Sequence, residues 1–415
     1  MISDIIIVGG GASGLIAAVV AARAGSKVTI LEHKDKIGKK ILATGNGKCN
    51  YTNLNQSSSC YRGEDSTFPW KSLHEFGVEE TVDFFRELGI HPKNKNGYLY
   101  PNSEQASSVL EVLCLELKNL NVNIICNEHV ESIRLAKAKK KEKNRYLIRT
   151  QNHNYSSYKV ILATGGMASS NLGSDGSGYY LAKEFGHKII EPVPALVQLR
   201  SKERYFKNLA GIRVTASMKL YIDGKESTGS SGELQLTNYG VSGIPVFEIS
   251  RYASRALYEK KEVDFIVDFL PEIESNQLFQ LIEERAYQNG YKNIEELFIG
   301  LLNKKLAYVI IKEANIDLNK LSSQIGKREI NQLVHKIKCF KIPIDKANSF
   351  SNAQVSAGGV DTREVNCYTM ESKLCRGLYL VGELLDVDGT CGGYNLQWAW
   401  SSGYLAGKDA ANKLD

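Results

Sequence analysis

The first apolar runs of the chain predict a strand, a helix and a second strand in close succession. A β-branched run at residues 4–8 is followed by a glycine turn, and a stretch rich in Ala, Leu and Val covers residues 15–24. Gly25 ends that stretch, and residues 28–31 form a second apolar run. Strand, turn, helix and strand in this order make a βαβ unit, the building block of a parallel sheet.

Later apolar runs predict strands that extend or flank this sheet. They cover residues 122–126, 130–135, 146–150 and 160–163. We expect the middle two to pair across a basic tip. Near the end of the chain, residues 377–381 form another buried-strand candidate.

The pattern changes between about Pro192 and Ser349. Strand-like runs at residues 212–222 and 263–269 are separated by glycine- and serine-rich loops, notably residues 227–232. A helical periodicity follows. Its apolar face is formed by Leu278, Leu281, Ile282 and Ala286, and its capping-box pattern by Asn293 and Glu296.

These changes predict an α/β domain that is discontinuous in sequence, because surface loops accept insertions well. We place the first domain at residues 1–190 and 350–415, an inserted β-rich domain at residues 191–270 and 339–349, and a small helical domain at residues 271–338.

The composition is that of an ordinary globular protein, with 43% hydrophobic and 24% charged residues in a chain of 415. The formal net charge of +6 would suggest a nucleic-acid partner, but residues 134–145 hold seven basic residues and one acid, which is the whole excess. We see no extended basic face and predict no nucleic-acid partner. The basic run is interpreted as a solvated hairpin tip, with an interaction tail as the alternative.

Eight cysteines include no C-x-x-C pair and no metal-ligand spacing, so we predict no metal site and no disulfide framework. The opening apolar run contains Asp4 and is broken by glycines, unlike a signal sequence. No other window approaches the ~20 apolar residues of a membrane span. We expect a cytoplasmic protein that does not bind membranes and acts on a small molecule, and no feature of the sequence indicates an oligomeric state.

The glycine turn matches the G-x-G-x-x-G pattern of dinucleotide-binding proteins. Gly9 permits the turn, Gly11 lets a pyrophosphate approach the backbone, and Gly14 allows close packing of helix on sheet. Glu32 ends the second strand, where a carboxylate accepts hydrogen bonds from ribose hydroxyls. This Rossmann-like fingerprint does not separate FAD from NAD.

Three further segments favour FAD. Residues 39–50 are glycine-rich and basic, so backbone donors and a lysine can reach the pyrophosphate or the flavin edge. The small residues at 162–166 let the chain pass close to a dinucleotide. Glu383 follows a strand, where it can bond the ribityl chain, and residues 392–397 open a helix whose N-terminus can stabilise negative charge on a reduced flavin.

The candidate cofactor-binding residues are Gly9, Gly11, Ser13, Gly14, Glu32, Lys40, Gly45, Asn46, Gly47, Lys48, Cys49, Asn50, Ala163, Thr164, Gly165, Gly166, Gly382, Glu383, Gly393, Tyr394, Asn395, Leu396 and Gln397.

Nearly the whole chain resembles the BaiN-like or YhiN-like FAD flavoproteins, which include aminoacetone oxidases and bile-acid pathway reductases. The resemblance rests on GGGASGL near the N-terminus, ATGNGKCNYTN at 43–53, GELQLTNYGVSGIP at 232–245, and AGGVDTREV with GLYLVGELLDVDGTCGGYNLQWAWSSG near the C-terminus. It implies a discontinuous FAD domain interrupted by a β-barrel-like domain and a small helical domain. It also implies that Val130 contacts the adenine through its backbone.

The chain departs from the pattern of that family at a few positions. Many members carry Arg where this chain has Lys48, and a His with Gly-Pro where it has Asn238 and Ile244-Pro245. Lysine presents a point charge in place of a planar fork, which removes any bidentate contact. The changes in the inserted region favour a different substrate preference.

Flavin chemistry needs little from side chains beyond positioning and charge. Tyr394 and Tyr239 are the candidate catalytic residues, and Cys49 and Cys391 are interpreted as structural thiols. Our leading hypothesis is a reductase that passes hydride through FAD to an activated alkene, with NAD(P)H as reductant. The alternatives are an oxidase of a small amine or ketone that uses O₂, a non-catalytic flavin sensor or partner protein, and a tRNA-modifying flavoprotein.

Overall fold

The computed structural model of the chain describes residues 2–136 and 145–412, so most of the basic run at 134–145 lies outside the described residues. The chain forms two compact units, one of Met1–Val193 with Gln354–Asp415 and one of Pro194–Ala353. The first unit contains both ends of the chain, which confirms the predicted discontinuous α/β fold class. The three domain boundaries drawn from the sequence stay a prediction.

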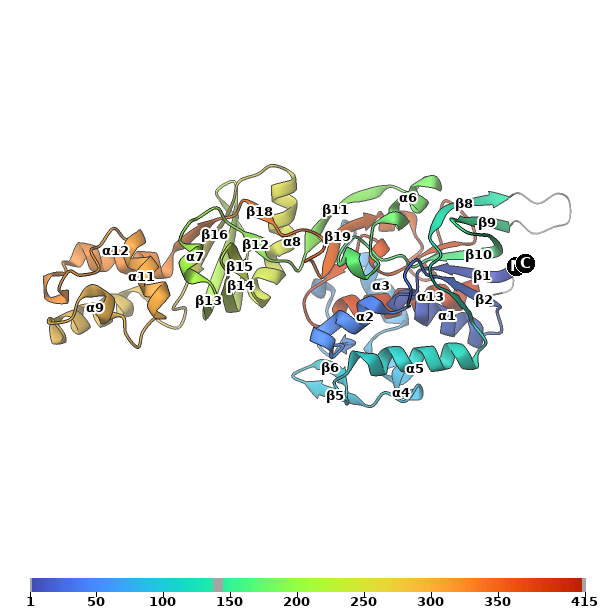
Figure 1. Cartoon of the computed structure of the whole chain (residues 1–415), viewed down its shortest axis with the longest axis horizontal. Helices are drawn as coiled ribbons and strands as arrows, with labels where there is room; N and C mark the ends of the chain where they lie inside the picture. Colours follow the sequence, from blue (N-terminus) through green and yellow to red (C-terminus); the bar gives the residue numbers. More distant parts are fainter. Residues whose placement is uncertain (1, 137–144, 413–415) are drawn as a thin grey trace. The chain divides into compact units, whose positions relative to one another are not determined.

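A parallel sheet forms the centre of the first unit (Figure 1). Its strands run in the order β7, β2, β1, β10 and β20, and an antiparallel hairpin of β9 and β8 also pairs with β10. Leu162 of β10 lies between Val8 of β1 and Leu380 of β20, so the end of the chain adds a strand to the sheet begun by its start. The bounds are β1 (Ile2–Val8), β2 (Val28–Leu31), β7 (Asn123–Ile125), β8 (Val130–Ala136), β9 (Arg145–Thr150), β10 (Asn154–Leu162) and β20 (Leu378–Leu380).

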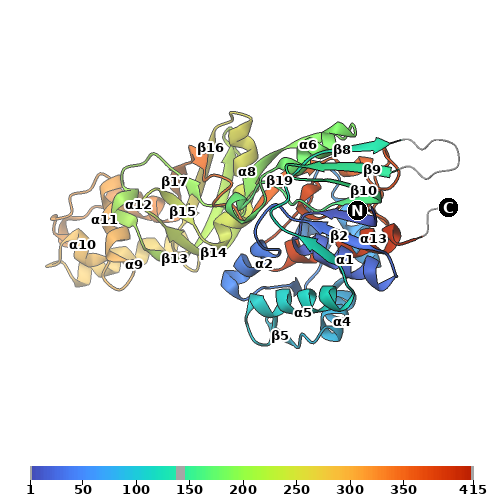
Figure 2. The ribbon, with the colours of Figure 1, turned by 45° about the vertical axis from the view of Figure 1, so that its right-hand side comes forward.

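The helices α1 (Ala12–Arg23) and α13 (Tyr394–Ala410) pack on one another in this unit (Figures 1 and 2). Their backbones approach closely where α13 has glycine. A Cβ on Gly403 would lie 2.3 Å from the backbone oxygen of Ser13, and a Cβ on Gly407 would lie 2.5 Å from that of Ala17. The two glycines therefore allow a contact that any side chain would block.

The remaining elements of the first unit complete the layers around this sheet. They are α2 (Lys39–Ala43), β3 (Thr52–Asn53), β4 (Tyr61–Arg62), α3 (Thr67–Glu75), α4 (Val78–Glu87), β5 (Pro92–Lys95), β6 (Tyr98–Pro101), α5 (Ala106–Asn119), α6 (Ser177–Glu184), β11 (Ile189–Ala195), which pairs with β19 (Val355–Val360), and β21 (Asp388–Gly389).

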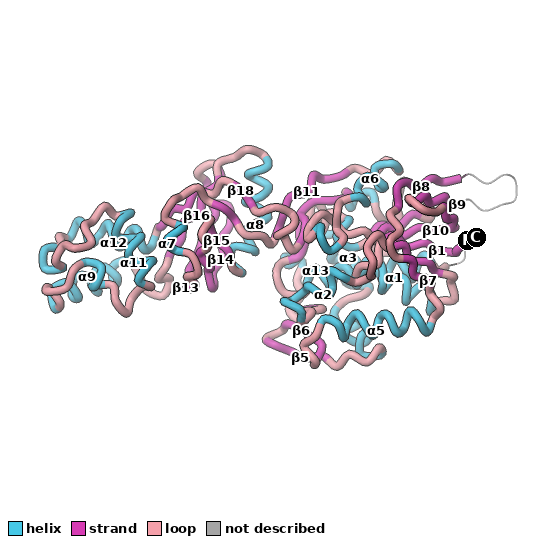
Figure 3. Tube along the Cα trace, in the orientation of Figure 1, coloured by secondary structure: helices cyan, strands magenta, loops and turns pink. Residues whose placement is uncertain are grey.

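The second unit contains an antiparallel sheet and several helices, drawn in magenta and cyan in Figure 3. The strand order is β17, β16, β13, β14, β15, β12 and β18. The strands are β12 (Leu199–Arg200), β13 (Arg213–Ile222), β14 (Lys225–Leu236), β15 (Gly240–Ser242), β16 (Val263–Asp268), β17 (Phe340–Pro343) and β18 (Lys346–Ala347). The helices are α7 (Phe206–Leu209), α8 (Ile244–Tyr258), α9 (Ser275–Gln288), α10 (Ile294–Leu297), α11 (Lys304–Glu313) and α12 (Lys327–Lys338).

The predicted helical features of this unit are present. Leu278, Ile282 and Ala286 are buried on one face of α9. At α10, Asn293 Oδ1 accepts from the backbone N–H of Glu296 and Glu296 Oε2 accepts from that of Asn293, both at 2.9 Å, which confirms the capping box.

The prediction of a loop at residues 227–232 is wrong. These residues lie inside β14, which pairs with β13 from Lys225 to Gln235. Most side chains on this part of the strand are exposed or half-buried, so no apolar alternation marks it. Backbone pairing with β13 holds the segment as strand, and glycine and serine accept that pairing where no side chain needs to be buried.

Among the helices of the described residues, none is long and apolar enough to cross a bilayer.

Candidate cofactor site

The glycine turn between β1 and α1 is tightly packed at two positions and open at a third. Gly9 has φ of +105°, and a Cβ there would lie 2.4 Å from the backbone oxygen of Ala163. A Cβ on Gly14 would lie 2.1 Å from the backbone oxygen of Gly9. On Gly11 it would meet nothing within 4 Å. The turn thus brings α1 against the sheet while leaving space in front of its first residues.

The start of α1 presents unsatisfied N–H groups to that space. Its N-cap is Gly11, no side chain of the described residues caps it, and its first turn contains no acid. A helix N-terminus of this kind carries free N–H donors and a partial positive charge, which suits a diphosphate.

Glu32 lies directly after β2 and is buried. Its Oε2 accepts from the backbone N–H of Gly10 and its Oε1 accepts from that of Lys34, both at 2.8 Å. These bonds fix the carboxylate beside the glycine turn. Oε2 keeps a second lone pair, so the carboxylate can still accept from a ribose hydroxyl.

Lys40 and Glu383 meet although they are far apart in sequence. Lys40 Nζ lies 2.6 Å from Glu383 Oε2 and donates to the backbone oxygen of Ala168 at 3.1 Å. Glu383 Oε1 accepts from the backbone N–H of Ser356 at 2.9 Å. The pair joins α2 to the turn that follows β20, and contact of Glu383 with a ribityl chain stays a prediction.

Ser356 is a residue that sequence reasoning missed. Besides its bond to Glu383, its hydroxyl accepts from the backbone N–H groups of Met167 at 2.9 Å and Ala168 at 3.1 Å. It therefore holds the segment after Gly166 against β19. The signal was its position directly before the AGGV run that carries part of the family resemblance.

Lys48 lies in a different environment from Lys40. Its Nζ is 3.2 Å from Glu104 Oε2, and the same carboxylate contacts Lys93 and Lys95. The three lysine side chains are 41–50% exposed. Together they hold the pKa of Glu104 at about 2. Lys48 is thus part of an exposed ion cluster, and its contact with a cofactor stays a prediction.

The end of the 39–50 segment is buried. Gly45 and Asn46 take left-handed conformations in a short 3₁₀ turn that also includes Gly47. Burial raises the pKa of the Cys49 thiol to about 12, which keeps it protonated and supports its interpretation as a structural thiol. Asn50 Oδ1 is buried without a hydrogen-bond partner among the described residues.

The start of α13 lies beside this unpaired oxygen. A Cβ on Gly393, its N-cap, would lie 3.0 Å from Asn50 Oδ1. Within the described residues no side chain caps the helix, and its first turn contains no acid. A buried acceptor without a partner is costly, so this position fits a bound group that donates a hydrogen bond, as the flavin ring N–H does.

The polar side chains of α13 hold the helix start in place. Asn395 Oδ1 accepts from the backbone N–H of Gly389 at 2.8 Å. Gln397 is fully buried; its Oε1 accepts from the Thr52 hydroxyl and its Nε2 donates to Thr81 Oγ1 at 2.9 Å. The backbone N–H groups of this turn, including that of the half-buried Leu396, are what the helix can offer a ligand.

The two candidate catalytic tyrosines differ in their hydrogen bonds. The Tyr394 hydroxyl donates to the backbone oxygen of Asn55 at 2.9 Å. Tyr239, in the second unit, is half-buried; its hydroxyl accepts from Asn348 Nδ2 at 3.3 Å, and the Arg200 guanidinium lies 4.7 Å from its ring centroid. The catalytic roles of both stay predictions.

The other predicted residues also lie in the first unit. A Cβ on Gly382 would come within 2.7 Å of Ser13 Oγ, so the end of β20 touches the start of α1. Ala163, Thr164, Gly165 and Gly166 continue from the end of β10, and the buried Val130 begins β8. The structure brings these segments to one end of the parallel sheet.

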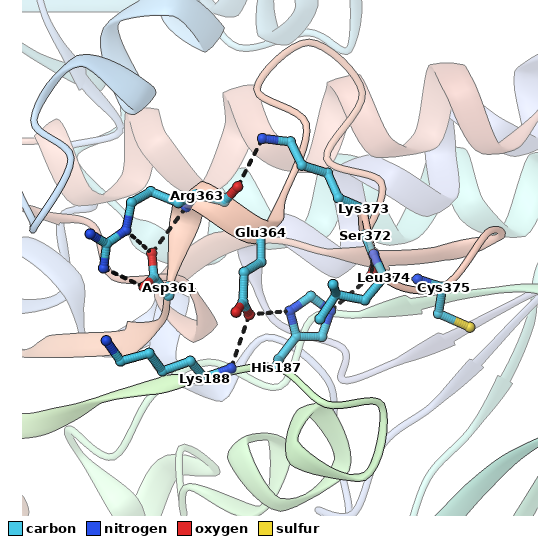
Figure 4. Close-up of polar contacts among 9 residues, drawn as sticks. All are labelled: His187, Lys188, Asp361, Arg363, Glu364, Ser372, Lys373, Leu374 and Cys375. Carbon is cyan, nitrogen blue, oxygen red and sulfur yellow. Dashed lines mark hydrogen bonds and ion pairs between the residues drawn. The ribbon is translucent and has the colours of Figure 1, made fainter.

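A second polar cluster has the residue types of a hydrolase triad (Figure 4). His187 Nε2 lies 2.8 Å from Ser372 Oγ, and its Nδ1 lies 3.1 Å from Glu364 Oε2. Ser372 is only 5% exposed, and its oxygen accepts from the backbone N–H groups of Leu374 and Cys375. The serine therefore stabilises a turn and cannot reach a substrate. Burial lowers the pKa of His187.

The donor set fits FAD in three respects: the open N-terminus of α1 suits a diphosphate, Glu32 a ribose, and the start of α13 with Asn50 a flavin ring. The parallel sheet and this site define a flavoprotein of the Rossmann type. Residues 3–409 match the HI0933-like protein Rossmann domain, and the chain belongs to the HI0933-like family. This confirms the resemblance noted in the sequence, and the protein is an FAD-dependent oxidoreductase.

Three relatives extend over almost the full chain. The chain is 46% identical over 409 residues to a protein of Clostridium scindens named 3-dehydro-bile acid delta(4,6)-reductase, with 98% of each chain covered. It is 32% identical to a ribosomal RNA dihydrouridine synthase of Haemophilus influenzae, with 97% of each covered. It is 27% identical to the ribosomal RNA dihydrouridine synthase of Escherichia coli, covering 98% of this chain and 97% of that protein.

Proposed function

We propose that this protein reduces a carbon–carbon double bond conjugated to a carbonyl group in a small organic substrate, with NAD(P)H as the source of hydride. The observation that carries the proposal is the 46% identity, over 98% of both chains, to the protein named 3-dehydro-bile acid delta(4,6)-reductase. The identity to the two relatives named for RNA is lower, at 32% and 27%.

Bound FAD supplies the hydride transfer between reductant and substrate. The protein holds and tunes it. The free N–H groups at the start of α1 would bind the diphosphate, and Glu32 would accept from a ribose hydroxyl. The N–H groups at the start of α13 would face the flavin ring as hydrogen-bond donors and favour its electron-rich, reduced form.

Reduction of an alkene also requires a proton, and the hydrogen bonds favour Tyr239 over Tyr394 as its donor. The proton of Tyr394 is committed to the backbone oxygen of Asn55. The hydroxyl of Tyr239 accepts from Asn348, which leaves its own proton available to a substrate. Tyr239→Phe should lower kcat and leave flavin reduction by NAD(P)H unchanged, whereas Tyr394→Phe removes a hydrogen bond to Asn55 and should not lower kcat in this selective way.

A second candidate function is dihydrouridine formation in ribosomal RNA, which two relatives are named for. Uracil also contains a double bond conjugated to a carbonyl, so the same flavin chemistry serves both substrates. The expectation of no nucleic-acid partner rests on charge balance alone, and these relatives argue against it. Residues 137–144 of the basic run lie outside the described residues.

The two functions separate in one anaerobic turnover assay. The holoprotein is given NADH or NADPH with either a bile-acid dienone or ribosomal RNA that lacks dihydrouridine. We expect the dienone to gain two hydrogens by mass spectrometry and the RNA to stay unchanged. Conversion of the RNA alone would replace the proposal with the second candidate. Peroxide production from small amines, without alkene reduction, would instead favour an oxidase.

A further inference from the structure

Three side chains from separate segments of the first unit gather near Glu32. They are His33, His129 and Asp175, and one ligand atom of each lies within 4.8 Å of those of the other two. His33 follows β2, His129 precedes β8, and Asp175 lies two residues before α6, all elements seen in Figure 1. Two imidazoles and a carboxylate at this spacing form a donor set typical of a transition-metal site.

His33 is oriented as a metal-binding histidine is. Its Nδ1 lies 3.4 Å from Glu32 Oε1, and that carboxylate is itself held by backbone N–H groups. A carboxylate beside one ring nitrogen favours a proton there and leaves the lone pair on the other nitrogen. That other nitrogen, Nε2, is buried and has no hydrogen-bond partner among the described residues.

The buried Nε2 of His33 faces the carboxylate of Asp175 but forms no hydrogen bond with it. His33 Nε2 lies 3.9 Å from Asp175 Oδ2, which is too long for a hydrogen bond. Two ligand atoms on one tetrahedral Zn²⁺ lie about 3.3 Å apart, given bonds of about 2.0–2.1 Å. A closure of roughly half an ångström would therefore place both on one ion.

Asp175 has one oxygen fixed and one directed at the cluster. Its Oδ1 accepts from the backbone N–H of Ser177 at 3.0 Å and from the Ser177 hydroxyl at 2.6 Å. The Asp175 side chain is 38% exposed, while that of His33 is 22% exposed. The site is thus held from inside and open to solvent on the carboxylate side, which gives an ion a path to enter.

We propose that His33, His129 and Asp175 bind a divalent transition-metal ion of the Zn²⁺ class, with water at the fourth position. The ion would tie together the end of β2, the start of β8 and the turn before α6. Since Glu32 lies beside His33, occupancy by the ion should also strengthen FAD retention, because the two ligands share a fixed carboxylate. The proposal does not depend on the substrate of the enzyme.

The test is a titration of the FAD-loaded protein with Zn²⁺ in competition with a chelating dye, repeated with Co²⁺ to record its visible spectrum. We expect one ion per chain and no thiolate charge-transfer band with Co²⁺. Such a band would show that one or more of the eight cysteines bind the ion instead. His129→Gln and Asp175→Asn should each weaken binding at least tenfold, since each removes a ligand. His91→Gln, at an exposed histidine outside the cluster, is the matched control and should bind as the natural chain does.

The metal-free melting temperature and the circular dichroism spectrum of each variant show that it is folded. Equal Zn²⁺ binding by all variants, a thiolate band with Co²⁺, or binding that appears only after FAD is removed would each overturn the proposal. None of these measurements uses alkene reduction, so their failure and failure of the proposed function are distinguishable.

Discussion

Two lysines of one short segment belong to two different regions of the first unit. Lys40 pairs with Glu383 at what we call the chain junction, where residues 2–193 meet residues 354–412. Lys48 pairs with Glu104 in the exposed lysine cluster, together with Lys93 and Lys95. The Lys40 side chain is 26% exposed and that of Lys48 is 50% exposed. Two lysines eight residues apart therefore differ in importance, because Lys40, unlike Lys48, connects the N-terminal and C-terminal parts of the first unit.

The largest effect should come from closing the space between α1 and α13 at the junction. Gly407→Ala places a methyl group 2.5 Å from the backbone oxygen of Ala17, so the helices must separate. We expect the free energy of unfolding to fall by about 1–3 kcal/mol, as for other overpacked sites. FAD should then be released at a lower temperature, which flavin fluorescence measures. In Gly326→Ala, the matched control, the new methyl group meets only Glu329 Oε2 at 3.9 Å, and the release temperature should stay unchanged.

The two lysines provide the next comparison. Lys40→Met leaves the Glu383 carboxylate, 18% exposed, without its cation, so we expect FAD to dissociate at least tenfold more readily, about 1.4 kcal/mol. Lys48→Met should change FAD retention less than about twofold, since Glu104 keeps Lys93 and Lys95. Equilibrium dialysis measures the FAD affinity of both variants. Equal losses of affinity would contradict the proposed difference between the chain junction and the lysine cluster.

A smaller effect concerns pH at another part of the junction, where His187 contacts Glu364 and Ser372. Burial lowers the pKa of His187 below its ordinary 6.5, so the unfolded state binds a proton more readily than the folded state. The stability contributed by neutral His187 should therefore be fully present above about pH 6.5 and decrease as the pH falls below that value. The melting temperature of His187→Gln, although lower, should depend less on pH between about 7 and 5.5. An unchanged slope would contradict this.

The smallest effect should appear in the lysine cluster. Glu104 has its pKa held at about 2 by Lys93, Lys95 and Lys48, against an ordinary 4.5, so its contribution is present above about pH 4.5 and lost as pH falls toward 2. These side chains are exposed and screened by salt. We expect Glu104→Gln to change the melting temperature near neutral pH by about 1 °C or less, and less still in high salt. A larger shift would mean that the lysine cluster contributes as much to stability as the chain junction does.

Local sequence patterns predict the parts of the site that depend on neighbouring residues. The turn from Gly9 to Gly14, the acid at Glu32 and the helix that begins at Tyr394 each follow from a few adjacent positions. The strand at residues 227–232 escaped prediction because its side chains carry no burial pattern and its pairing partner is β13.

Contacts between residues far apart in the chain could not be predicted from the sequence. The pairing of Lys40 with Glu383, the role of Ser356 and the approach of His129 and Asp175 to His33 depend on which strands become neighbours. Metal-ligand spacing can be recognised in a sequence when the ligands are a few residues apart, and the three residues of this cluster are spread over three segments.

Reoxidation of the reduced flavin by a dienone distinguishes alkene reduction from the alternative functions. The holoprotein is photoreduced without oxygen, which makes the result independent of the natural electron donor, and then mixed with one equivalent of a bile-acid dienone. The proposed function predicts that the flavin is reoxidised and that the dienone is reduced in equal amount. A flavin that stays reduced until O₂ is admitted, or that is reoxidised only by ribosomal RNA lacking dihydrouridine, would contradict it.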